Sequence, residues 1–191
     1  MTEAGYLGAL IPEKYGGMAL DLSAGCAILG EVNLSGANAG PAHAQMYTMG
    51  TLLRHGSEEQ KRQYLPKIAR GDLRLQAFAV TEPEAGTDTT SIRTTATREG
   101  DHYVVNGRKI YISRVEQSDL MILLARTTPI EERERHSSGL SVFLVDLREI
   151  EARDDEQRDQ RASLRRPTAS CGKHYRRRGK RFPLHHRWHE R

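Results

Sequence analysis

Phe78-Ala79-Val80-Thr81-Glu82-Pro83-Glu84-Ala85-Gly86-Thr87-Asp88 is the stretch from which the rest of the chain is best interpreted. Its apolar beginning predicts a strand. Its polar end predicts a turn, because Pro83 fixes φ and Gly86 permits backbone geometries that other residues avoid. Hydroxyl and amide groups gathered after a strand can hydrogen-bond a carbonyl-rich or phosphate-bearing ligand. An ordinary surface loop explains the same residues, so this stretch alone leaves both interpretations open.

The residues before this stretch have the pattern of helices. A helix over Ser23 to Leu34 is expected to be capped at Asp21 or Ser23, and Asn38 to Leu53 predicts a second helix. Ser57-Glu58-Glu59-Gln60 fits a capping box, which predicts a third helix that stops near Pro66 to Gly71. Residues 1–72 are therefore expected to form a helical segment.

The pattern changes to strands from residue 73 onward. Asn106-Gly107 is the strongest short signal for a tight hairpin, and it predicts that strands on either side of it pair with each other. Helices first and strands second indicate an α+β fold with an antiparallel β-domain over 73–150, and not a βαβ nucleotide fold. The expected strands are 75–81, 91–98, 102–105, 108–113, 120–125 and 140–146.

Charge separates the tail from the body. Residues 151–191 hold 13 of the 29 Lys and Arg and 6 of the 25 Asp and Glu, which gives the tail +7 and leaves −3 for the body. The tail has almost no aliphatic residues, so we expect it to be disordered. Its clustered arginines suggest an alternative function, in which a non-catalytic protein binds nucleic acid or another polyanion. No base-reading motif accompanies the arginines.

The sequence shows no pattern typical of a membrane protein, a metal-binding protein, a disulfide-rich protein or a secreted protein. No apolar run approaches the roughly 18 residues of a membrane helix, so no membrane partner is expected. Cys26 and Cys171 are far apart and form neither a metal-ligand spacing nor a disulfide framework. No signal-peptide pattern is present, and the cytoplasm is the expected compartment.

The stretch from residue 78 resembles the signature of the acyl-CoA dehydrogenase family, small–aliphatic–Ser/Thr–Glu–x–x–x–Gly–Ser/Thr–Asp, at every specified position. Three further segments resemble family elements in the same order, so the resemblance covers roughly residues 4–150. It implies an FAD-dependent oxidoreductase of fatty acid metabolism that performs α,β-dehydrogenation of acyl-CoA thioesters. It also implies that an electron-transfer flavoprotein accepts the electrons and that the protein is a homo-oligomer. Nucleic acid is not among the partners that it implies. The three segments are Ile11 to Gly17, His55 to Pro66 and Asn106 to Ser113.

The resemblance also implies which residues contact the ligands. The ring of the flavin is expected against two walls, and Thr87 is expected near the thioester end of the substrate or the cofactor. Tyr111 stands where the family usually has Trp or Phe, and its aromatic face should still stack. Glu82 corresponds to a structural position of the motif. One expected wall is Phe78, Ala79, Val80 and Thr81, and the other is Tyr111, Ile112 and Ser113.

Complete family members supply the catalytic glutamate and much of the FAD contact from a C-terminal helical domain. No carboxylate in residues 1–150 matches that base, so the chain is expected to be an inactive fragment with only part of the N-terminal domain. When the tail is back-translated and moved forward by one base, its codons permit strings that resemble the family's continuation, such as G-F-R-Y-I-I-D-G-M-N from Arg181 to Arg191. We therefore expect 151–191 to be out of frame, with a natural basic tail as the alternative.

Overall fold

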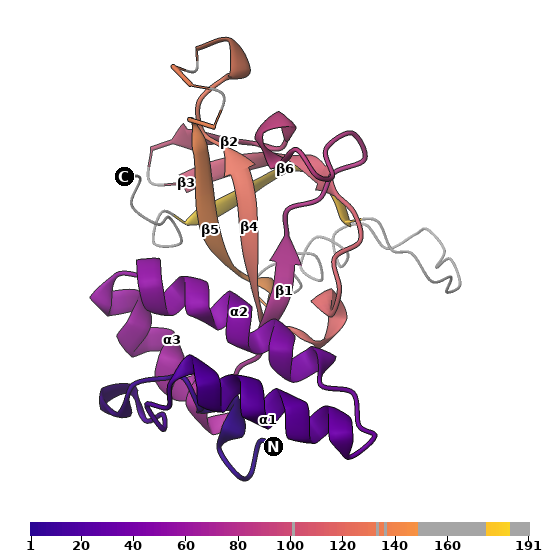
Figure 1. Ribbon diagram of the computed structural model, residues 1–191. Coiled ribbons are helices and arrows are strands. Elements are labelled where there is room, and N and C mark those ends of the chain that lie inside the picture. Colours follow the sequence, from indigo (N-terminus) through magenta and orange to yellow (C-terminus); the bar gives the residue numbers. More distant parts are fainter. Residues whose placement is uncertain (101, 133, 136, 149–174, 184–191) are drawn as a thin grey trace, which may run out of the picture. The chain divides into compact units, whose positions relative to one another are not determined.

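The computed structural model describes residues 1–148 except 101, 133 and 136, and the backbone of 175–183. Two compact units divide the chain, one made of 1–77 with 113–120 and the other made of 78–112 with the described residues from 121 onward. Figure 1 shows the helices and strands that make them up. The expected boundary at 72/73 stays a prediction.

Three α-helices form most of the first unit: α1 (Leu22–Leu34), α2 (Gly40–His55) and α3 (Glu58–Arg70). Asp21 caps α1, accepting from the Ala24 amide at 2.8 Å. Ser57 and Gln60 form the predicted capping box of α3, with bonds of 2.9 and 3.1 Å between side chain and backbone. The predicted helices and caps are confirmed. Short 3-10 turns, η1 (Tyr6–Gly8) and η2 (Glu13–Tyr15), precede them.

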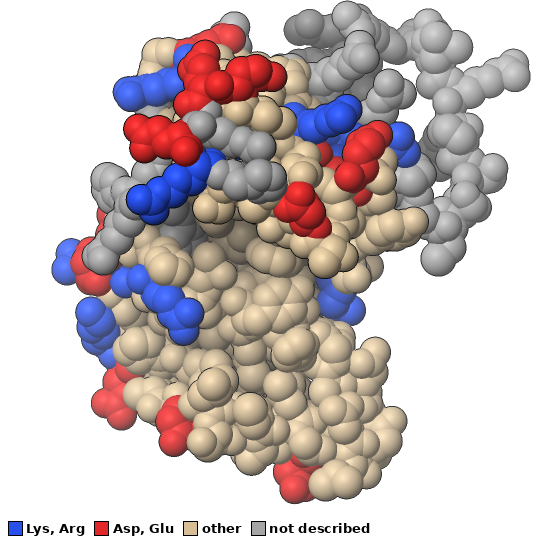
Figure 2. Space-filling view, turned by 45° about the horizontal axis from the view of Figure 1, so that its top comes forward, with Lys and Arg blue, Asp and Glu red and all other residues tan. Residues whose placement is uncertain are grey.

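Helix α1 is apolar but mostly uncovered. Gly25 is its one buried residue, while Leu22 and Leu34 are 72% and 81% exposed. Figure 2 shows a wide area with few charged side chains over the helical segment. No helix within the described residues is long and apolar enough to cross a membrane.

The strands form a mixed sheet in the order β1-β4-β2-β3-β6, with β5 paired to β4. The expected α+β class is confirmed, but the sheet is not wholly antiparallel. β2 runs parallel to β4 at Thr95 and Arg126, and the connection from β3 to β4 is a crossover, since β2 lies between them in the sheet. The strands are β1 (Leu75–Ala79), β2 (Thr95–Glu99), β3 (His102–Lys109), β4 (Leu120–Arg126), β5 (Leu140–Asp146) and β6 (Tyr175–Pro183).

The hairpin predicted at Asn106-Gly107 is wrong. β3 continues through both residues, and the β2–β3 turn lies between Glu99 and His102, where Gly100 has φ 63°. A Cβ on Gly107 would lie 2.3 Å from Oγ1 of Thr94, so this glycine permits a close approach of β3 to the residue that precedes β2. The β3–β6 register also shifts between Val105 and Gly107.

Three further expectations differ from the structure. The strand expected over 91–98 starts at Thr95, because residues 89–91 form the 3-10 turn η3 (Thr89–Ser91). The strand expected over 108–113 ends at Lys109, and Tyr111 has φ 56°, outside the strand region. In the tail, Tyr175–Pro183 pairs with β3 as a strand, and the rest of 151–191 lies outside the described residues.

Candidate functional site

One backbone hydrogen bond joins Thr81, the last residue of the first predicted wall, to Ile110, the residue just before the second. The amide of Ile110 donates to the carbonyl of Thr81 at 3.0 Å, just after β1 and β3 end. The residues that follow β1 therefore lie beside the residues that follow β3. This contact joins segments that are about thirty positions apart in the sequence.

Strand geometry decides which side chains of β1 face outward. Phe78 is 42% exposed, whereas its neighbours Ala77 and Ala79 are completely buried. Successive side chains of a strand point to opposite faces, so the Ala79 side chain lies in the core. Only the backbone of Ala79 can belong to a ligand-facing wall. Val80 and Thr81 are half-buried.

Tyr111 presents an aromatic ring to solvent beside this strand end. It is 83% exposed and adopts φ 56°, a left-handed conformation that costs a non-glycine residue on the order of 1–3 kcal/mol. Ile112 after it is half-buried, and Ser113 is exposed and belongs to the first compact unit. The structure thus brings Phe78, Thr81 and Tyr111 to one region of the second unit.

Thr87 lies in a compact exposed turn after the strand. Glu82 and Ala85 exchange backbone hydrogen bonds of 3.0 and 3.2 Å, which closes a tight turn over Pro83 and Glu84. Asp88 then accepts from the Thr90 amide at 3.0 Å and begins η3. Thr87 is exposed between these two turns.

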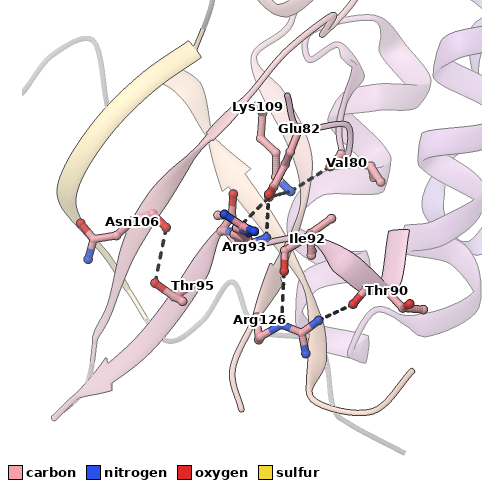
Figure 3. A network of polar contacts seen from close by, with 10 residues as sticks. Val80, Glu82, Thr90, Ile92, Arg93, Thr95, Asn106, Lys109 and Arg126 are labelled. Atoms are coloured by element: carbon pink, nitrogen blue, oxygen red, sulfur yellow. Dashed lines mark hydrogen bonds and ion pairs between the residues drawn. The ribbon is translucent and has the colours of Figure 1, made fainter. Parts of the chain in front are cut away.

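A buried ion pair that the sequence analysis missed lies behind the wall. Lys109 Nζ lies 2.8 Å from Glu82 Oε1, and the two side chains are 2% and 3% exposed. Lys109 also donates to the carbonyl of Val80 at 2.9 Å, while Glu82 accepts from the amides of Arg93 and Thr94 at 2.6 and 3.0 Å. Figure 3 shows Lys109 reaching from β3 to both Glu82 and Val80.

These contacts determine the charge state of the pair. Burial would raise the pKa of Glu82, but hydrogen bonds from Lys109, Thr94 and the Arg93 backbone outweigh it and hold the pKa below its ordinary value. Burial lowers the pKa of Lys109, and Glu82 opposes that shift only in part. Glu82 is therefore an ionised structural anion and is poorly suited to act as a general base near neutral pH. The structural role expected for Glu82 fits this geometry.

Arg126 is a second buried cation in the same network. It donates to the carbonyls of Ile92 at 3.3 Å, Thr90 at 2.6 Å and Ser138 at 3.4 Å, and it is 3% exposed. These bonds fasten the loop around η3 to β4 (Figure 3). The only sequence signal for these two buried cations was a charged residue within a predicted strand segment, Lys109, and one directly after a predicted strand, Arg126. Within the described residues, no group of His, Cys, Asp and Glu could hold a metal ion.

Two family models match the chain. Residues 1–72 match "Acyl-CoA dehydrogenase, N-terminal domain", and residues 77–165 match "Acyl-CoA dehydrogenase, middle domain". A glutaryl-CoA dehydrogenase from Desulfococcus multivorans is 36% identical over 152 residues, which are 78% of this chain and 38% of that protein. An acyl-CoA dehydrogenase from Bacillus subtilis strain 168 is 38% identical over 148 residues, 76% of this chain and 38% of the relative.

Solved structures show the same likeness. The ChsE4-ChsE5 complex from Mycobacterium tuberculosis contains a chain that is 30% identical with a TM-score of 0.77, and the match covers 100% of this chain and 47% of that one. The chain spans about two fifths of the length of the two relatives named above.

Proposed function

The chain belongs to the acyl-CoA dehydrogenase family, and on this premise we propose that Phe78 to Thr81, which span the end of β1, and the residues after β3 together form one wall of an FAD site. The reaction we propose for the whole protein is α,β-dehydrogenation of an acyl-CoA thioester. In this reaction, bound FAD would accept a hydride. The residues of this chain contribute the surface on which the ring rests.

The exposed apolar side chains of the second unit carry the proposal. Its described residues include three large exposed hydrophobic side chains, Phe78, Tyr111 and Ile130. Two of the three flank the hydrogen bond between Thr81 and Ile110. A planar aromatic ligand needs such a surface, because stacked or edge-to-face aromatic contacts stabilise it beyond simple burial. The residues present therefore fit a flavin ring.

Polar groups at the edge of the wall would orient the ring. The hydroxyl of Thr81 is the group we assign to its polar edge, and Thr87 is assigned to the thioester end of the substrate or the cofactor. Glu82 is held by three donors, and we assign it no proton transfer. For the whole protein we also propose a general base, an electron-transfer flavoprotein as electron acceptor, and assembly as a homo-oligomer.

Titration of FAD with the 191-residue chain tests the wall. Quenching of flavin fluorescence should saturate, and Phe78→Ala and Tyr111→Ala should each weaken binding by roughly three- to tenfold, as the loss of one aromatic contact implies. Ile130→Ala is the matched control, since it removes the third exposed apolar side chain of the unit. An absence of saturable binding, or equal affinities for all three variants, would overturn the proposal.

A further inference from the structure

The buried ammonium of Lys109 is bonded to a carbonyl of the proposed wall itself. Its Nζ donates to the Val80 carbonyl at 2.9 Å, and Val80 lies one residue before Thr81. A charged donor makes a stronger hydrogen bond than a neutral one. The side chain is 2% exposed, so water does not compete for this bond.

Fixing the Val80 carbonyl also fixes the amide that follows it. The peptide between Val80 and Thr81 is planar and trans, because the chain has no cis peptide bond. In a trans peptide the carbonyl and the next N–H point in opposite directions. The N–H of Thr81 therefore points away from Lys109, and none of the described residues accepts a hydrogen bond from it.

We propose that Lys109 is a positioning residue, which turns the Val80–Thr81 peptide so that the Thr81 N–H is presented to a ligand carbonyl or ring nitrogen on the wall. This inference rests on the proposed FAD site. Lys109 acts through the peptide and does not touch the ligand. Glu82 supports the arrangement by balancing the charge of Lys109, at 2.8 Å from its Nζ.

Three variants of the full chain separate positioning from stability. Lys109→Met removes the donor to Val80 and leaves Glu82 as an unpaired buried anion. The double variant Lys109→Met with Glu82→Gln removes that charge as well, so it should be more stable than the single variant while still lacking the donor. Arg126→Met removes a buried cation that reaches Thr90, Ile92 and Ser138 but not Val80, and it serves as the control.

Two readouts on folded protein are compared. The carbonyl ¹³C resonance of Val80 and the amide ¹⁵N resonance of Thr81 report the hydrogen bond from Lys109 in the absence of flavin. FAD titration reports how that hydrogen bond affects FAD affinity. Both variants that lack Lys109 should move the two resonances and weaken FAD binding roughly three- to tenfold, the range for one hydrogen bond. Arg126→Met should do neither.

The result that overturns the proposal is a folded double variant with wild-type resonances at Val80 and Thr81, or with wild-type FAD affinity. Failure of the proposed function appears differently. In that case the wild-type chain itself shows no saturable FAD binding, while the two resonances still show whether Lys109 orients the peptide. If the Lys109→Met chain does not fold, the double variant decides the outcome.

Discussion

Among single residues, Gly107 has no room for a side chain, whereas Gly86 has ample room for one. A Cβ on Gly107 would lie 2.3 Å from Oγ1 and 2.6 Å from the Cα of Thr94, whereas a Cβ on Gly86 would meet nothing within 4 Å. Gly107→Ala should therefore lower the free energy of unfolding by about 1–3 kcal/mol, as overpacking does. Gly86→Ala should stay within about 0.5 kcal/mol of wild type. Urea unfolding measures both, and equal effects would contradict the close approach.

Glu82 gives a pH dependence whose sign is fixed by its lowered pKa. A carboxylate with a lower pKa when folded stabilises the fold above its unfolded value of 4.5, and this contribution is lost as pH falls through the folded pKa. Glu82→Gln should lower stability at pH 7 by about 3 kcal/mol. It should also flatten the loss of stability below pH 4.5. Denaturant unfolding from pH 7 downward measures this, with the exposed Glu84→Gln as control. A slope in Glu82→Gln equal to wild type would refute the assignment.

At the scale of elements, local signals predicted helices better than strand pairing. The caps of α1 and α3 depend on residues three positions apart, so the sequence alone contained them. The signal at Asn106-Gly107 was also local, but its outcome depended on Thr94, which is twelve positions away from Asn106 and close only in the folded chain. Strand pairing is decided by such distant contacts, and for this reason the hairpin was predicted at the wrong place and the parallel pairing of β2 with β4 was not expected.

For the candidate site too, features set by nearby residues could be predicted and those set by distant contacts could not. The motif located the strand end, and the resemblance indicated the two segments that meet at Thr81 and Ile110. The burial of Ala79 follows from the alternation of the strand once its core face is known. The ion pair of Lys109 and Glu82 could not be inferred, because the partners are 27 positions apart and nothing in either segment specifies the other.

The capping box of α3 allows a direct test of element stability. Ser57 accepts from the Gln60 amide, and the Gln60 side chain accepts from the Ser57 amide. Ser57→Ala should lower the free energy of unfolding by about 1 kcal/mol, the usual cost of losing an N-cap. Ser23→Ala, an exposed serine inside α1, should change it far less. Thermal unfolding of the two variants checks this, and a larger loss at Ser23 would contradict it.

At the scale of the whole molecule, the origin of the tail can be tested at the gene. The middle-domain match runs to residue 165, so it includes the first fifteen residues of the tail, and only 166–191 lie outside both family matches. We propose that the tail is read out of frame, because a one-base shift permits family-like strings in the expected order. Resequencing should find a single-base insertion or deletion near codon 150 that restores a homologous frame. If no one-base change does so, 151–191 is a natural basic tail, and its binding to heparin becomes the property to measure.

The FAD wall proposed at Phe78 to Thr81 and after β3 is tested most directly by mapping which segments of the 191-residue chain FAD protects. Amide hydrogen exchange, followed by mass spectrometry with and without saturating FAD, reports each segment separately. We predict slower exchange in peptides covering 78–81 and 110–112, and unchanged exchange in α1. Bound FAD that leaves these two segments unprotected, or that protects the helices instead, would contradict the proposed wall.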